Sequence, residues 1–191
     1  MSDKTNPGNF FEDFRVGQEI RHATPRTVGE GDAAVYMALY GSRFALPSAA
    51  SFAQSLGFRR APVDELLAFH ILFGKTVPDI SLNAIANLGY ASCVFGAPVY
   101  AGDTLATTST VIGLRENSNR QSGVVHVRSV GQNQRGEVVL DYVRWVMVRK
   151  RDPDAPAPPG EAPALPAAVA VEDLHVPAQP LLDSYDSALA G

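Results

Sequence analysis

The 191-residue sequence contains little of several residue types, and each shortage excludes a class of protein. A single cysteine, Cys93, rules out a disulfide framework and a zinc site built from several cysteines. No segment approaches the roughly 18 consecutive apolar residues of a membrane-spanning helix. The 16 basic and 20 acidic residues give a net charge of −4, without the cationic excess typical of nucleic-acid-binding proteins. Residues 1–14 lack the apolar segment of a signal peptide, so we expect a cytoplasmic protein with no membrane or nucleic-acid partner.

Common catalytic motifs are also missing from the sequence. It has no Gly-rich phosphate loop, no G-x-S-x-G motif and no His/Cys cluster with metal-ligand spacing, so we expect no bound metal. The four histidines are scattered. His70 falls in the middle of a predicted helix, where a core role and a functional role both remain open, while His126 shares a predicted strand face with Arg128 and is expected to be solvated. His22 and His175 fall in predicted edge or linker positions.

The composition changes near Arg151. Hydrophobic residues make up 46% of the chain, which is enough to form a sizeable core. Eight of the 14 prolines, however, lie between Pro153 and Pro180, and such a segment favours extended conformations over a packed core. The sequence therefore predicts one domain over residues 1–150. Residues 151–191 form a Pro/Ala-rich linker or tail, which could lead to an absent second domain.

The periodicity of residues 1–150 predicts an α+β fold. Residues 18–28 suit a strand, and residues 29–41 a helix that ends at Gly41. A second helix is expected to begin with Ser48 as its N-cap, and a third at Pro62. Apolar side chains lie all around this third helix, so we expect it to be buried. Four long strands follow, over residues 84–95, 103–115, 123–132 and 137–149, joined by turns typical of antiparallel hairpins.

The last predicted strand is apolar on both of its faces. Val143 and Trp145 alternate with positions such as Leu140 and Val146, so both faces need to be covered. A single buried helix can cover only one face of the sheet. A second subunit or domain is therefore expected.

Two segments, residues 10–46 and 94–119, resemble the MaoC-like hydratases of the hot-dog fold. The second contains the strand–turn signature of that family at Pro98, Val99, Gly102, Asp103, Thr104 and Leu105. Residues 60–91 and 133–153 resemble more closely the N-terminal half of the mesaconyl-CoA hydratase (β-methylmalyl-CoA dehydratase) group, whose members are tandem double hot dogs. The resemblance covers about residues 10–150. It implies a long antiparallel sheet wrapped around one buried helix.

The resemblance also implies a reaction, the reversible addition of water across the double bond of an enoyl-CoA thioester. In the family a motif of the form G-D-x-N-P-x-H supplies an Asp and a His as acid and base. Here Gly41 matches the glycine, but Ser42 occupies the Asp position and Pro47 the His position, and neither can act as the base. Asp64 and His70 are the nearby alternative, yet six residues along a helix place them about 120° apart. The sequence thus resembles a substrate-binding half that lacks its own acid/base pair.

By the same resemblance, backbone N–H groups at the start of the third helix are expected to polarise the thioester carbonyl. Val63, Asp64 and Glu65 offer the first of these groups, because Pro62 has no N–H. The CoA phosphates need cations, for which Arg59, Arg60 or Arg120 are candidates. Asn117, Asn119 and Arg120 could form a polar rim that touches the ligand, or only a solvated hairpin tip.

The leading hypothesis is an enoyl-CoA hydratase/3-hydroxyacyl-CoA dehydratase component, a hydro-lyase acting on mesaconyl-CoA or a similar short branched enoyl-CoA. The alternative is a non-catalytic acyl-CoA-binding hot-dog half that pairs with a catalytic hot dog; a thioesterase is a third possibility. No separate cofactor is expected, because CoA enters with the substrate. The expected partner is a second copy or a second hot dog, and the isolated chain is expected to be weakly active or inactive.

Overall fold

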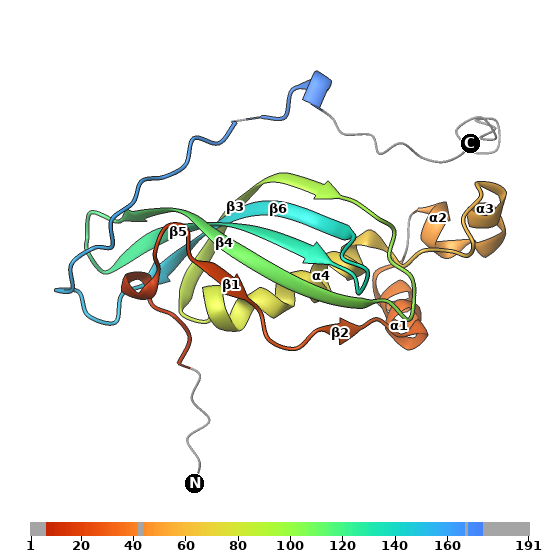
Figure 1. The fold of residues 1–191 in the computed structure, drawn as a ribbon, viewed down its shortest axis with the longest axis horizontal. Coiled ribbons are helices and arrows are strands. Elements are labelled where there is room, and N and C mark those ends of the chain that lie inside the picture. The colour runs from red at the N-terminus through yellow and green to blue at the C-terminus, as the bar shows by residue number, and fades with distance from the viewer. Residues whose placement is uncertain (1–6, 42–43, 167, 174–191) are drawn as a thin grey trace, which may run out of the picture.

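The computed structural model describes residues 7–41, 44–166 and 168–173, and it has the expected α+β architecture (Figure 1). In chain order the elements are η1 (Phe11–Asp13), β1 (Glu19–Arg21), β2 (Arg26–Thr27), α1 (Glu30–Tyr40), α2 (Ala45–Ser48), α3 (Ala50–Ser55), α4 (Glu65–Thr76), η2 (Val77–Ser81), β3 (Ala84–Phe95), β4 (Thr104–Glu116), β5 (Ser122–Gln132), β6 (Val138–Arg149) and η3 (Val171–Asp173). No helix within the described ranges is long and apolar enough to span a membrane.

The sheet is antiparallel, with the strand order β1-β4-β5-β6-β3, and β2 also pairs with β4. The β5–β6 hairpin shows why the predicted turns form. The Asn133 side-chain oxygen accepts hydrogen bonds from the backbone N–H groups of Arg135 and Glu137, and Gly136 supplies a left-handed φ of 78°. The predicted long strands and their hairpins are confirmed.

Helix α4 packs along the sheet and continues directly into η2 (Figure 1). Its buried side chains are Leu67, Ala68, Ile71, Leu72 and Thr76. These residues share a stripe on one side of the helix, and the apolar ones join a core with Leu105 and Leu140 of the sheet. Leu72 lies so close to Gly131 of β5 that a side chain at that glycine would overlap it. The sheet and helix therefore form the predicted hot-dog arrangement.

Helix α4 differs from the expectation in two ways. It begins at Glu65, three residues after Pro62, because the Val63 N–H instead donates to the Val99 carbonyl (2.7 Å). It is also buried on one side only. Leu66 keeps 48% of its surface exposed, and His70 is exposed as well, so a core role for His70 is wrong.

Two other local predictions were also wrong. Ser48 is the last residue of α2, and its hydroxyl donates to the Phe44 carbonyl (2.7 Å), so it does not cap the next helix. The strand expected over residues 18–28 is broken into β1 and β2. Between them Thr24 has a left-handed φ of 54°, which turns the chain.

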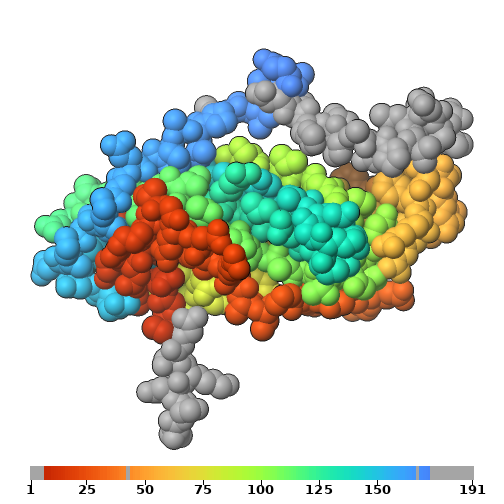
Figure 2. Space-filling model, viewed as in Figure 1, coloured from red at the N-terminus to blue at the C-terminus, as the bar shows by residue number. Residues whose placement is uncertain are grey.

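The start of the Pro/Ala-rich tail is attached to the domain. The ammonium group of Lys150 donates to Glu116 (2.8 Å) and to the carbonyls of Pro153 and Ala155. Further on, the Leu114 N–H of β4 donates to the Glu161 carbonyl (3.2 Å). Figures 1 and 2 show the first part of this segment in blue along one end of the domain, before the chain rises clear of it. The division at residue 150 and the second domain beyond the tail stay predictions.

Exposed apolar side chains lie elsewhere than expected. On β6, Val143 is buried and Trp145 is half-buried, because Trp145 packs over Gly89 and stacks on His126. Half of the large exposed apolar residues of the described ranges lie instead on two elements. They are Ile85, Leu88, Tyr90 and Val94 of β3 and Val35, Leu39 and Tyr40 of α1. Since β3 ends the sheet, the apolar surface available to a partner includes this open edge.

Candidate functional site

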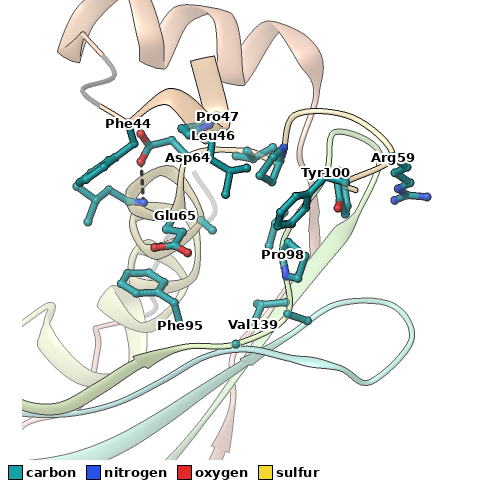
Figure 3. Close-up of a pocket in the computed structure, with 18 of the residues that line it drawn as sticks. Phe44, Leu46, Pro47, Arg59, Asp64, Glu65, Phe95, Pro98, Tyr100 and Val139 are labelled. Atoms are coloured by element: carbon teal, nitrogen blue, oxygen red, sulfur yellow. Dashed lines mark hydrogen bonds between the residues drawn. The ribbon is translucent and has the colours of Figure 1, made fainter. Parts of the chain in front are cut away.

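A cavity of about 880 Å³ lies at the start of α4 (Figure 3). Three segments far apart in sequence build its walls. They are the α2 region with Phe44, Leu46 and Pro47, residues 57–68 leading into α4, and residues 95–100 after β3, with Val139 of β6. Apart from Arg59, Asp64 and Glu65, the side chains that line it are uncharged and mostly apolar. Its size and lining are typical of a site for an elongated, largely apolar organic ligand.

The turn after β3 fixes one wall of the cavity. Asp103 accepts hydrogen bonds from the Tyr100 N–H (2.8 Å) and the Gln134 side chain (2.8 Å). Although burial alone would raise the pKa of Asp103, the hydrogen bonds from Gln134, Tyr100 and Arg135 hold that pKa below its ordinary value. Tyr100 is thereby held in the cavity wall. The strand–turn signature seen in the sequence therefore has a structural role beside the site.

The backbone donors expected at the helix start are only partly available. The Val63 N–H is used by Val99, so Val63 cannot serve as a donor to a ligand. The Leu66 N–H is used by the side chain of Asp64, the N-cap of α4 (2.9 Å). This leaves the N–H groups of Asp64 and Glu65, which have no acceptor among the described residues. Both residues line the cavity.

The charges of the cavity lie on opposite sides (Figure 3). Neither Asp64 nor Glu65 forms an ion pair with any described residue. The pKa of Glu65 is raised, first by burial and then by the neighbouring negative charge of Asp64. Across the cavity, the Arg59 guanidinium carbon lies 4.2 Å from the centre of the Tyr100 ring, a cation–π contact. Arg60 is engaged with the Ala101 carbonyl and lies 3.8 Å from Glu30.

Other predicted ligand-binding residues are not brought to this cavity. Asn117, Asn119 and Arg120 lie in the turn that follows β4. The cavity is lined by the loop that precedes β4, at the opposite end of that strand. A strand of 13 residues separates the two places by about 40 Å. The Asn117 carbonyl accepts from the Arg120 N–H (2.9 Å), and its amide donates to Ser122 (2.8 Å). These residues stabilise the hairpin.

Ser42 and Pro47 are the residues that the resemblance aligns with the family acid/base pair. Ser42 lies outside the described residues. Pro47 lines the cavity and has no proton to transfer. The alternative pair is not formed either, because the His70 ring packs between Tyr36, Tyr40 and Phe69 and does not line the cavity.

The sequence analysis missed two buried polar groups. His22 is buried, and its two ring nitrogens contact Asp79 (2.7 Å) and Ser109 (2.8 Å). Arg144 is fully buried on the inner face of β6 and donates to Thr76 (2.8 Å) at the end of α4. The regular alternation of β6 was the available signal for Arg144, since it shares its face with Leu140 and Val146. Both groups lie near the C-terminal end of α4, and neither lines the cavity.

His126 is also buried, contrary to the expectation, because its ring stacks on Trp145 of the neighbouring strand (5.9 Å between ring centres). Burial, and secondly the charge of Arg115, lower its pKa. Within the described ranges, no three His, Cys, Asp or Glu side chains are grouped as a metal site would require.

Comparison with known proteins identifies the family. The family model described as mesaconyl-CoA hydratase matches residues 1–179. The chain belongs to the mesaconyl-CoA hydratase family. A curated relative, the β-methylmalyl-CoA dehydratase of Chloroflexus aurantiacus, is 68% identical over 191 residues, which are 100% of this chain and 54% of the relative. The chain thus spans about half the length of that relative.

Solved structures agree with the family and the fold. A putative MaoC domain protein dehydratase from Chloroflexus aurantiacus superposes with a TM-score of 0.90 at 68% identity, over 100% of this chain and 54% of the other. A Mycobacterium tuberculosis protein described as a double hot-dog fold superposes with a TM-score of 0.75 at 26% identity, covering 95% of this chain and 56% of its own. This member of the mesaconyl-CoA hydratase family therefore has the hot-dog fold.

Proposed function

We propose that this chain is the acyl-CoA-binding half of a hydro-lyase that interconverts mesaconyl-CoA and β-methylmalyl-CoA. The observation that carries the proposal is the cavity at the start of α4, where free backbone donors meet apolar walls. Family membership and the 68% identity to a β-methylmalyl-CoA dehydratase support the choice of substrate.

In the proposed complex the thioester carbonyl accepts hydrogen bonds from the N–H groups of Asp64 and Glu65. Such donors stabilise the negative charge that develops on the thioester oxygen when water adds to the double bond. The apolar walls exclude water from the pantetheine arm. The CoA phosphates are expected near Arg59, which has a cation–π contact with Tyr100 but no carboxylate partner among the described residues.

We infer that the acid and base come from a second hot-dog unit, either a further domain of the same protein or a second copy of the chain. By the resemblance Pro47 occupies the position of the family histidine, and no histidine is among the described residues that line the cavity. The open edge of β3, with its exposed Ile85, Leu88 and Tyr90, offers an apolar surface for that unit. The half-length coverage of the relative and the double hot dog of the Mycobacterium protein support this pairing.

Calorimetric titration of the chain with a short acyl-CoA tests the binding site. Arg59→Ala should weaken binding about 10- to 100-fold, because a charge-assisted hydrogen bond contributes roughly 1.5–3 kcal/mol. Arg60→Ala should weaken it less, since Arg60 is already engaged with Ala101 and Glu30. Arg120→Ala is the control and should bind normally. Equal binding by all four proteins would refute the placement of the phosphates, and no binding by the wild type would show that this half alone does not form the site.

A further inference from the structure

The negative charge of the cavity is concentrated where the proposed thioester would lie. Asp64 and Glu65 both line this wall, and neither has an ion pair with a described residue. Arg59 is the one cationic side chain of the described lining, and it lies on the far side, beside Tyr100 (Figure 3). No cation therefore stands next to the two carboxylates.

The substrate of the proposed reaction carries a charge of its own. A mesaconyl group is derived from a dicarboxylic acid, and only the two double-bonded carbons separate its free carboxylate from the thioester carbonyl. With the thioester at the start of α4, a free carboxylate turned into the cavity would lie within a few ångströms of Glu65. Like charges at that separation repel, although water screens part of the repulsion because the Glu65 side chain is exposed.

We propose that Glu65 excludes the free carboxylate of the acyl group from this cavity, so that the cavity binds the uncharged pantetheine arm and the thioester. The charged end of the acyl group then points outward, to a second unit that supplies its counter-charge. This inference rests on the proposed function and assigns Glu65 as a residue that determines which part of the substrate the cavity accepts.

Two further features of the cavity favour this arrangement. Its volume of about 880 Å³ is far larger than a five-carbon acyl group requires, and it suits the long pantetheine arm. Its uncharged lining, including Phe44, Phe58 and Pro98, is mostly apolar, and the donors near it are the Tyr100 hydroxyl and the Asp64 and Glu65 N–H groups that the thioester would use. A carboxylate in this cavity would therefore lose its hydration and gain repulsion.

Titration with two matched thioesters tests the inference. Mesaconyl-CoA and 2-methylcrotonyl-CoA (the tiglyl isomer) have the same carbon skeleton, but a methyl group replaces the free carboxylate in the second. We expect the wild type to bind the two with similar affinity or to favour 2-methylcrotonyl-CoA. Glu65→Gln should bind mesaconyl-CoA at least about fivefold more tightly than the wild type does, and 2-methylcrotonyl-CoA within twofold.

Two control variants isolate the charge of Glu65. Glu65→Asp keeps the charge and should keep the wild-type preference, which also controls for damage to the first turn of α4. Glu19→Gln removes an exposed carboxylate of β1 that is paired with Arg21, far from the lining, and should change neither affinity.

The outcomes separate the inference from the proposed function. If no CoA thioester binds the wild type, the proposed function fails, and the inference fails with it. If both thioesters bind but the wild type favours mesaconyl-CoA tenfold or more, the cavity recognises the carboxylate and the inference is overturned. It is also overturned if Glu65→Gln leaves both affinities unchanged or shifts them equally.

Discussion

The Nδ1 atom of His22 lies 2.7 Å from the Oδ2 atom of Asp79, and this contact joins the end of β1 to η2 after the central helix. On its other side, Nε2 of His22 contacts Ser109 (2.8 Å), whose hydroxyl contacts Ser129 (2.7 Å). These contacts link His22 through Ser109 of β4 to Ser129 of β5. Burial lowers the pKa of His22 below 6.5 even though Asp79 acts in the opposite direction.

The lowered pKa of His22 predicts a loss of stability in mild acid. The unfolded chain takes up a proton near pH 6.5, whereas the folded chain takes it up only at lower pH. The unfolded state therefore binds more protons in this window, and the stability present above pH 6.5 is lost as the pH falls toward the folded pKa. Melting temperatures measured from pH 7.5 down to 5 should fall accordingly.

His22→Gln is the matched variant for this pH dependence. It should melt at a lower temperature at pH 7.5, because buried hydrogen bonds are disturbed, but should lose less stability on acidification. The melting temperature of the variant should still depend on pH to some extent, since burial lowers the pKa of His126 as well. A variant whose melting temperature falls as steeply as that of the wild type would show that His22 is not responsible.

The contact between the tail and β4 makes a second prediction. A Cβ atom added at Gly113 would lie 2.5 Å from the Glu161 carbonyl oxygen and would also overlap Pro163. Gly113→Ala should therefore detach the tail or destabilise the domain by about 1–3 kcal/mol, as overpacking typically does. Urea unfolding measures the loss of domain stability. Limited proteolysis within residues 152–166 measures detachment of the tail.

Gly74→Ala provides the control for Gly113→Ala. Gly74 lies in α4, and nothing stands within 4 Å of a Cβ atom added there. Alanine should stabilise the helix by about 0.5–1 kcal/mol, because glycine is the poorer helix former. If both variants behave alike, the tail is not held against β4 in solution.

The sequence was sufficient to predict the long strands and the hairpins, because their alternation and turn residues are local signals. The start of α4 could not be predicted in this way. Its position depends on the hydrogen bond from Val63 to Val99, two residues 36 positions apart, which overrides the favourable placement of Pro62 at a helix start. His22 and His126 were misjudged for the same reason, since their burial arises from contacts with distant strands.

The site was partly predictable. The resemblance to hot-dog hydratases singled out Asp64, Glu65 and Arg59, all of which line the cavity. Arg120 was grouped with them as a cation expected near the mouth of the site, but the length of β4 already separates its hairpin from the turn after β3. The apolar wall formed by α2 gave no distinct signal in the sequence. It became visible only when the fold brought Leu46 and Pro47 into the same cavity as Val99.

The last prediction concerns the activity of the chain by itself. Pro47, which the resemblance aligns with the family histidine, lines the cavity and cannot accept or donate a proton. A general acid or base typically contributes about 10²- to 10⁴-fold to the rate, so the purified chain should hydrate mesaconyl-CoA at least about 10²-fold more slowly than a full-length relative. Initial rates under matched conditions, followed by loss of the enoyl-thioester absorbance, measure the difference. Because binding needs only the cavity whereas turnover also needs the acid and base, the chain should bind acyl-CoA while turning it over poorly. Turnover within about tenfold of the full-length relative would mean that this half contains an acid/base pair of its own.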